Sequence, residues 1–352
     1  MATQAVEKEQ PLLSVQDLKI RIQMENGVMN AVDGVDFNIY KGKTLGLVGE
    51  SGCGKSLTSR SIISINPKEC ETSGTITYNS DSESTLHGLN LLSLKPTGKQ
   101  IRSIRGRKIS MIFQEPMTAF SPMYTIGNQI MEAIRIHQTR NKKEAKRIAL
   151  EMLSKVGISD QAKRFDQYPH EFSGGMRQRA MISMALSCNP EILIADEPTT
   201  ALDVTIQAQV LELMKSLQAE FGMAILLVTH DLGIIAEMCD EVAVMYLGRI
   251  VEQAPMREIF NNPKHPYTKG LLKSMPRLGG NKSKRLDSIE GSVPMPINMP
   301  PMCGFYDRCK DRIEGVCNQQ VVPKTAISDQ HMVRCFLYAD QREGEANDQT
   351  HS

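Results

Sequence analysis

One stretch, residues 49 to 56, constrains this chain more than any other. It is composed of Gly49, Glu50, Ser51, Gly52, Cys53, Gly54, Lys55 and Ser56. The apolar run before it, residues 44–48, predicts a buried parallel strand, and residues 57–63 after it predict the start of a helix. A strand, a glycine loop and a helix in this order are the context of a phosphate-binding P-loop. A plain glycine turn is the alternative, but it does not explain the full G-x-x-x-x-G-K-S spacing.

The residue types of this loop suit a triphosphate. Glycines let backbone N–H groups turn inward, and the N-terminus of the following helix adds a partial positive charge. We expect Lys55 to reach the β- and γ-phosphates and the Ser56 hydroxyl to bind Mg²⁺. The nucleotide contacts are assigned to the whole loop together with Leu57. The chain is therefore predicted to bind a nucleoside triphosphate.

Length and charge narrow the class of protein. A chain of 352 residues suggests two domains, and a net charge of +1 gives no reason to expect a nucleic-acid partner. No apolar run approaches the roughly 18 residues that a membrane span needs. Residues 1–8 lack an apolar core, so we expect no signal peptide. The eight cysteines then indicate reduced thiols or metal ligation.

The hydrophobic pattern predicts a mixed arrangement of strands and helices. Residues 12–40 alternate apolar and polar positions around a turn at 25–27, which favours antiparallel strands. Further strands are predicted at 74–79, 108–113, 191–195 and 224–228, and helices within 126–156 and at 175–186 and 204–221. This order predicts an α/β fold: a mostly parallel sheet, an N-terminal antiparallel β subdomain and an inserted helical subdomain.

Two adjacent carboxylates follow the predicted strand at 191–195. Asp196 at the strand end suits a contact to Mg²⁺, and Glu197 is placed to polarise an attacking water as general base. An Asp-Glu pair at a strand end can also be a helix or turn cap. Pairing with a P-loop favours the catalytic interpretation.

With these elements in place, the segment 171–179, EFSGGMRQR, identifies a resemblance. The motifs that carry it are the P-loop, Gln114, the Ser-Gly-Gly element, Asp196-Glu197, Leu202-Asp203 and His230. In this order they resemble the ATP-binding cassette ATPases. The resemblance implies a cassette domain over residues 12–258, with a helical subdomain at about 115–186.

Roles for further residues follow from the resemblance alone. It implies a head-to-tail dimer in which each P-loop faces the Ser173-Gly174-Gly175 element of the partner across ATP. Gln114 is implied to touch Mg²⁺ or the lytic water, Asp203 to communicate across the dimer, and His230 to contact the γ-phosphate. A Ser-capped, glycine-opened helix N-terminus is also a physically suitable anion site.

Two positions depart from the family pattern. The family usually has Gln where Met176 stands, outside the Ser-Gly-Gly phosphate contacts. An aromatic ring normally stacks on the adenine base, yet no aromatic residue occurs before Asp36. Ile22 occupies the corresponding position, so we expect aliphatic packing to replace stacking there.

The C-terminal part resembles one branch of this family. Residues 262–272, NPKHPYTKGLL, are similar to the tail of the oligopeptide/dipeptide transport ATPases. Residues 259–340 are thus expected to form the extension of that branch, and the polar residues 341–352 a disordered tail. The branch carries peptides, and some members are associated with nickel, small saccharides or antimicrobial peptides.

Four cysteines lie in the extension with the spacing C-x5-C-x7-C-x17-C, namely Cys303, Cys309, Cys317 and Cys335. Four thiolates can hold an iron–sulfur cluster, whereas structural zinc usually shows tighter cysteine pairs. A disulfide is disfavoured in a reducing compartment, and four ordinary buried cysteines remain an alternative. The resemblance to cluster-bearing members favours [4Fe–4S].

The expected function is that of the ATPase subunit of a bacterial-type peptide importer. The resemblance implies two transmembrane permease subunits, a second ATPase subunit that is a sister protein or a copy of this chain, and a periplasmic or extracellular solute-binding protein. It places the chain at the cytoplasmic face of the cell membrane. A non-transport cassette ATPase and a catalytically dead nucleotide sensor are the rival interpretations. Intact Lys55, Glu197 and His230 argue against the second.

Overall fold

The computed structural model describes residues 10–80, 82–115, 119–200, 202–275 and 289–339. The tail expected at 341–352 lies outside these residues. Among the helices that are described, none combines the length and the apolar character that crossing a membrane requires.

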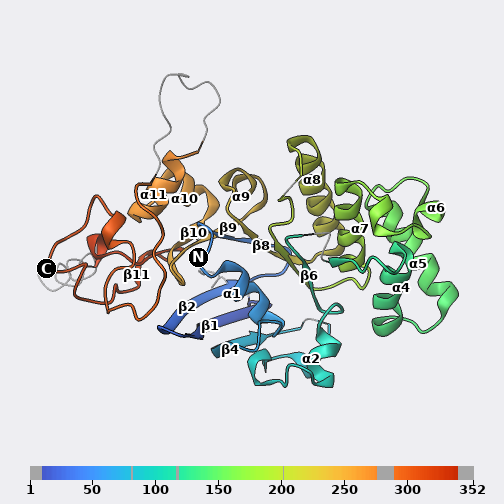
Figure 1. Cartoon of the computed structure of the whole chain (residues 1–352), viewed down its shortest axis with the longest axis horizontal. Coiled ribbons are helices and arrows are strands. Elements are labelled where there is room, and N and C mark those ends of the chain that lie inside the picture. Colours follow the sequence, from blue (N-terminus) through green and yellow to red (C-terminus); the bar gives the residue numbers. More distant parts are fainter. Residues whose placement is uncertain (1–9, 81, 116–118, 201, 276–288, 340–352) are drawn as a thin grey trace, which may run out of the picture.

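The helices and strands follow the order that the sequence pattern predicts (Figure 1). The strands are β1 (Leu13–Met24), β2 (Gly27–Ile39), β3 (Thr44–Val48), β4 (Cys70–Tyr78), β5 (Leu89–Asn90), β6 (Ile109–Ile112), β7 (Ile192–Asp196), β8 (Ala224–Thr229), β9 (Glu241–Tyr246), β10 (Arg249–Pro255), β11 (Thr325–Ser328) and β12 (His331–Val333). The helices are α1 (Lys55–Ile62), α2 (Lys99–Ile104), α4 (Ile126–His137), α5 (Lys142–Lys155), α6 (Gln161–Phe165), α7 (Gly174–Leu186), α8 (Val204–Phe221), α9 (Leu232–Met238), α10 (Met256–Asn261) and α11 (Pro266–Lys273).

The larger sheet has eight strands in the order β11-β12-β10-β9-β3-β8-β7-β6. The pairings from β9 to β6 are parallel, as predicted for the core. Strands β10, β12 and β11 continue the sheet antiparallel, so the sheet as a whole is mixed. The sequence pattern does not reveal β11 and β12, because they are only four and three residues long.

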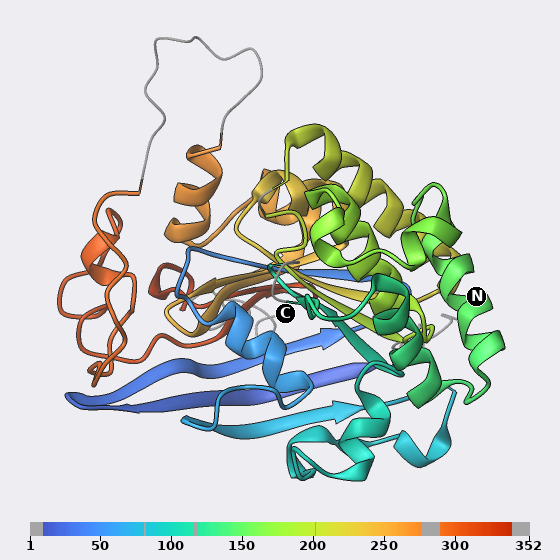
Figure 2. The same ribbon diagram turned by 45° about the vertical axis from the view of Figure 1, so that its right-hand side comes forward.

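A smaller antiparallel sheet, in the order β2-β1-β4-β5, forms the N-terminal subdomain. Helix α1 lies between this sheet and the larger one, where it contacts β2 on one side and β7 and β8 on the other (Figures 1 and 2). Alternate residues of β1 and β2 are buried, which explains the apolar alternation in the sequence. The P-loop helix α1 is thus packed between the two sheets.

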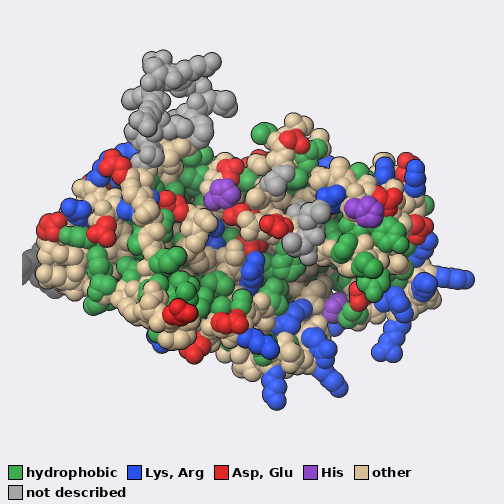
Figure 3. Space-filling model, in the orientation of Figure 1, with side chains coloured by type: hydrophobic (Ala, Val, Ile, Leu, Met, Phe, Trp, Pro, Cys, Tyr) green, Lys and Arg blue, Asp and Glu red, His purple; other side chains and the backbone are tan. Residues whose placement is uncertain are grey.

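The helical subdomain, α4 to α7, lies beside the β6 edge of the larger sheet (Figure 2). Side-chain caps start three of its helices: Thr125 for α4, Asn141 for α5 and Ser173 for α7. Lys and Arg side chains project along its outer surface and around α2 (Figure 3).

The C-terminal extension is joined to the cassette by the sheet itself. Strand β12 pairs with β10, opposing Val333 to Glu252. The Glu252 carboxylate is fully buried and accepts hydrogen bonds from the backbone N–H groups of Lys264 (2.6 Å) and His265 (2.9 Å), and from His331 Nε2 (2.8 Å). A buried carboxylate needs such partners, so Glu252 ties the extension to the cassette.

Candidate nucleotide site

The P-loop connects the buried end of β3 to the start of α1, as predicted. A Cβ atom at Gly49 would lie 2.1 Å from the backbone oxygen of Met245. Gly54 caps α1 with φ of 100°, and a Cβ there would lie 2.4 Å from the backbone oxygen of Ala31. Both positions require glycine because the loop packs closely on β9 and β2.

Lys55 lies folded against its own loop. Its ammonium group is buried and donates hydrogen bonds to the carbonyl oxygens of Gly49 (2.7 Å) and Glu50 (3.0 Å). These two carbonyl oxygens are hydrogen-bond acceptors for the Lys55 ammonium group. Lys55 is therefore placed to exchange two carbonyl partners for phosphate oxygens.

Ser56 and Asp196 meet at the foot of the P-loop, although they are far apart in the sequence. The Ser56 hydroxyl donates to Asp196 Oδ1 at 3.0 Å. Asp196 is fully buried, and its Oδ2 has no hydrogen-bond partner among the described residues, the Arg60 guanidinium being 4.0 Å away. Burial raises the pKa of Asp196 above its ordinary value. An orphaned carboxylate oxygen beside a hydroxyl fits a Mg²⁺ ion.

Glu197 is the centre of the adjoining polar group. Its Oε2 accepts hydrogen bonds from Gln114 Nε2 (2.9 Å) and from the Thr200 hydroxyl (3.0 Å), and its Oε1 lies 3.1 Å from His230 Nδ1. The structure thus brings together three side chains, Gln114, Glu197 and His230, that the sequence places 33 residues or more apart. Thr200 is a fourth member that the motif analysis did not include.

The backbone and charge state of Glu197 suit a functional residue. Its φ is 48°, in the left-handed region that non-glycine residues seldom occupy. Burial raises the pKa of the carboxyl, but hydrogen bonds from His230 and Thr200 outweigh it and lower the pKa below its ordinary value. Glu197 is therefore ionised at neutral pH, the state that a base requires.

The Ser-Gly-Gly element opens helix α7 on an exposed surface. Ser173 caps the helix by accepting from the backbone N–H of Met176 at 3.3 Å, and Ser173 and Gly174 are exposed. A Cβ at Gly175 would lie 2.9 Å from the Ile206 side chain of α8. An open, capped helix N-terminus is available to an anion that a partner brings.

Helix α7 is also tied to the strand that carries the two carboxylates. The buried Gln178 side chain donates to the backbone oxygen of Pro198, directly after Glu197. The sequence of residues 171–179 does not predict this contact of Gln178, because the contact depends on how the helical subdomain packs.

The roles of Asp203 and Ile22 stay predictions, and the structure shows the surroundings of both residues. Asp203 is exposed and caps α8 by accepting from the N–H of Ile206 at 3.0 Å, and Val204 beside it is 83% exposed. Ile22 is half-buried in β1, between Met29 of β2 and Cys70 of β4.

The four cysteines of the extension converge, as the spacing suggested. Cys303, Cys309, Cys317 and Cys335 all line one small cavity, and all four are free thiols. Burial raises the pKa of Cys303 to about 11 and that of Cys335 to about 12, and the neighbouring thiols add to both. In the described residues, however, no three His, Cys, Asp or Glu side chains are close enough to share one metal ion.

Two family profiles match the chain. Residues 32–200 match the profile described as ABC transporter, and residues 251–317 match that described as oligopeptide/dipeptide transporter, C-terminal region. The first spans the P-loop, the Ser-Gly-Gly element and the two carboxylates. The second spans the His-Pro-Tyr segment and three of the four cysteines.

Curated relatives resemble the chain over nearly its whole length. The dipeptide transport ATP-binding protein DppD of Bacillus subtilis (strain 168) is 49% identical over 331 residues, covering 94% of this chain and 96% of that protein. The oligopeptide transport ATP-binding protein AppD of the same organism is 49% identical over 330 residues, covering 94% and 98%. A solved dimeric ATP-binding cassette in a post-hydrolysis state with ADP and phosphate has a TM-score of 0.60 at 23% identity, covering 70% of this chain and 99% of that one.

Proposed function

The chain belongs to the ABC transporter ATP-binding proteins of the oligopeptide/dipeptide importer family, and from this premise we propose how its residues perform ATP hydrolysis. It is the ATP-binding subunit of a dipeptide/oligopeptide import system and an ATPase coupled to transport. The observation that carries the mechanism is the ionised Glu197 held between Gln114, Thr200 and His230, one residue after buried Asp196.

In this mechanism the P-loop binds the phosphates and Glu197 acts on water. Backbone N–H groups of residues 51–56 and the Lys55 ammonium hold the phosphate oxygens. Ser56 and Asp196 would hold Mg²⁺, which would supply positive charge beside the phosphates. Glu197 accepts the proton of the attacking water, and Gln114 and His230 orient water and γ-phosphate. Their present hydrogen bonds to Glu197 keep these side chains at the reacting position.

The dimer completes the site in this proposal. Such ATPases form dimers and assemble with permeases. A head-to-tail arrangement would set the Ser173-Gly174-Gly175 element, whose first two residues are exposed, against the γ-phosphate bound to the partner. Exposed Asp203 and Val204 would lie in the same contact. In the proposed complex, a second ATPase subunit (a sister protein or a copy of this chain) and two permeases would hold the chain at the cytoplasmic face of the membrane, and a solute-binding protein would deliver the cargo from the other side.

Uptake of labelled cargo tests the function and separates the cargo classes. Cells whose only copy of this subunit is the parent chain should take up a labelled dipeptide, and cells with Lys55→Ala should not. Nickel ions and a labelled disaccharide are assayed in parallel. Uptake of either of these but not of dipeptide would contradict the peptide assignment, and uptake with Lys55→Ala would contradict the role of ATP.

We also propose that the four cysteines of the extension hold a [4Fe–4S] cluster. The support is their convergence on one cavity as free thiols, of which Cys317 and Cys335 are buried and Cys303 and Cys309 half-buried. A four-iron cluster is larger than a single ion, so its ligands stand farther apart than thiols that share one metal. The segment is short and rich in proline, and such a segment gains a fixed shape from a metal staple.

Anaerobic purification tests the cluster. The parent chain should be brown with about four irons per chain. Cys309→Ser should lose the colour, and Cys70→Ser, a half-buried thiol outside the cavity, should keep it. Zinc in place of iron would contradict the cluster, and a colourless, metal-free parent would contradict metal binding altogether.

A further inference from the structure

The C-terminal extension touches the P-loop directly at Glu50. The Arg308 guanidinium donates to both carboxylate oxygens of Glu50, at 2.6 and 3.0 Å, and its side chain is only 5% exposed. The backbone N–H of Glu50 donates to the hydroxyl of Tyr267 at 2.9 Å. These partners lie 258 and 217 residues away from Glu50 in the sequence. No motif of the cassette or of the extension assigns this contact.

Arg308 is fixed in place by aromatic rings. Its guanidinium carbon lies 5.8 Å from the ring centre of Tyr246 and 5.9 Å from that of Phe305. The ring of Tyr246 lies 4.6 Å from that of Tyr267 and 5.2 Å from that of Phe305. A guanidinium held by cation–π contacts and by a bidentate ion pair has little freedom to move. Arg308 therefore holds Glu50 rigidly.

The same arginine belongs to the cysteine segment. Arg308 directly precedes Cys309, and its backbone N–H donates to Phe305 O at 3.1 Å in the turn that begins after Cys303. Backbone hydrogen bonds join this turn to Cys303 and Cys309, so Arg308 connects the cysteine site to Glu50.

Glu50 matters for nucleotide binding because of what Lys55 does. Lys55 donates to the Glu50 carbonyl, the Tyr267 hydroxyl accepts from the Glu50 N–H group, and Arg308 donates to the Glu50 carboxylate. If Lys55 turns to a phosphate, the contacts from Tyr267 and Arg308 still hold Glu50. The N–H groups that follow Glu50 in the loop must stay aimed at the phosphates.

We propose that Arg308 and Tyr267 are positioning residues that clamp the P-loop, and that they couple ATP affinity to the state of the cysteine site. The coupling rests on the proposed nucleotide function but not on the identity of the metal. Coupling between two sites is reciprocal, so bound ATP must also stabilise the cysteine segment.

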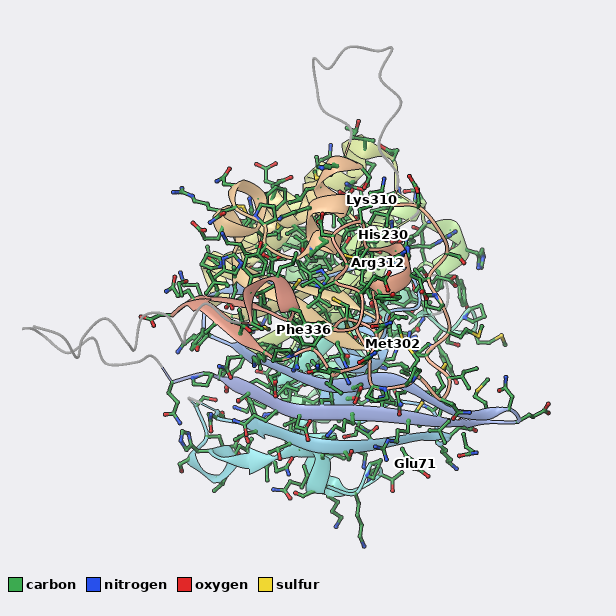
Figure 4. The ribbon with its side chains drawn as sticks, turned by 90° about the vertical axis from the view of Figure 1, so that its left-hand side faces the viewer. Glu71, His230, Met302, Lys310, Arg312 and Phe336 are labelled. Carbon is green, nitrogen blue, oxygen red and sulfur yellow. The ribbon has the colours of Figure 1, made fainter. Side chains whose placement is uncertain are left out.

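Nucleotide titration of the full-length chain tests the clamp. Arg308→Met and Tyr267→Phe should each weaken ATP binding about tenfold, the effect of losing one strong buried hydrogen bond, and should leave kcat at saturating ATP little changed. Arg308→Lys keeps the charge without the two-pronged geometry and should recover part of the affinity. Lys310→Met is the matched control. Lys310, which is labelled in Figure 4, pairs with Glu290 on the same segment. Its side chain is 78% exposed, so its loss should not disturb the P-loop.

The reciprocal effect gives a second measurement. In metal-free protein, ATP should slow iodoacetamide labelling of Cys303 and Cys309, mapped by mass spectrometry, in the parent chain and in Lys310→Met. The protection should be lost in Arg308→Met, and Glu50→Gln should reproduce that loss from the other side of the contact. A labelling rate without ATP equal to that of the parent shows that the variants are folded.

Two results would overturn the clamp: ATP affinities of folded Arg308→Met and Tyr267→Phe within twofold of the parent, or equal ATP protection in the parent and Arg308→Met. If the parent itself failed to bind ATP, the proposed function would fail instead. The two failures are thus distinguishable.

Discussion

The substitution Glu197→Gln removes the general base and leaves the other properties of the nucleotide site unchanged. The substitution keeps the size and shape of the side chain. The amide oxygen can still accept from Gln114 and Thr200, and the amide nitrogen can face His230. Asp196, Ser56 and the P-loop are untouched, so ATP and Mg²⁺ should bind as in the parent.

The expected magnitude follows from the role of the lost carboxylate. An amide cannot accept the proton of water, and a general base contributes about 10²–10⁴ in rate. This corresponds to about 3–5 kcal/mol in the activation barrier. Turnover should fall by that factor while the dissociation constant for ATP stays within about twofold of the parent. The ATP-bound dimer should accumulate because hydrolysis no longer opens it.

The assay pairs single-turnover phosphate release with equilibrium titration of ATP and size-exclusion chromatography. Hydrolysis by Glu197→Gln within a few-fold of the parent would refute the assignment of the base. A large loss of ATP affinity would show instead that the charge of Glu197 organises the binding site.

Thr200→Val tests the same assignment in another way, because it keeps Glu197 as the base and changes only the pKa of its carboxyl. The pKa of Glu197 lies below its ordinary value: burial raises it, and hydrogen bonds from His230 and Thr200 outweigh burial. The ionised base is present above that pKa and is lost as the pH falls through it. Removing the Thr200 hydroxyl raises the pKa, so the acid limb of the kcat profile should move to higher pH. An unmoved acid limb would mean that Glu197 does not control it.

Three further predictions concern binding and stability. Lys55→Ala should weaken ATP binding by about 1.5–3 kcal/mol, because it removes a charged donor to phosphate; equilibrium titration distinguishes this from a loss of turnover alone. Ile22→Tyr should tighten ATP binding by up to about 1–3 kcal/mol if this position faces the base, and unchanged affinity in a folded variant would place the adenine platform elsewhere. Glu252→Gln should lower the free energy of unfolding by about 1–3 kcal/mol in urea, whereas Glu258→Gln, on the exposed face of α10, should be neutral. Burial raises the pKa of Glu252, but its hydrogen bonds outweigh burial and lower the pKa below its ordinary value. The contribution of Glu252 to the free energy of unfolding is therefore present above the unfolded pKa of about 4.5 and is lost as the pH falls below that value.

The clamp on Glu50 suggests why the extension and the cassette are fused in one chain. Phe305 and Tyr267 of the extension belong to the same hydrophobic core as Tyr246 of the cassette. Because Tyr267 and Arg308 of the extension also contact Glu50, a loosened extension would disturb the P-loop. If the cysteines hold the proposed cluster, its loss would then weaken ATP binding as well as the extension.

The chemistry of the nucleotide site could be predicted from the sequence because its parts are local. A buried strand, glycines at fixed spacing and a helix start specify the P-loop within about twenty residues, and the Asp196-Glu197 pair follows directly from a strand of apolar residues. The antiparallel hairpin β1–β2 and the helix α8 follow in the same way from periods of two and 3.6 residues.

Only the tertiary structure decided which distant segments meet. Thr200 joins Glu197 because a turn bends back on the strand end, and Cys335 reaches the other cysteines because β12 pairs with β10. Arg308 finds Glu50 across 258 residues. Hydrophobic periodicity states which face of a strand or helix is buried, but not which element will cover it. That choice is made by packing, and packing placed the extension against the P-loop.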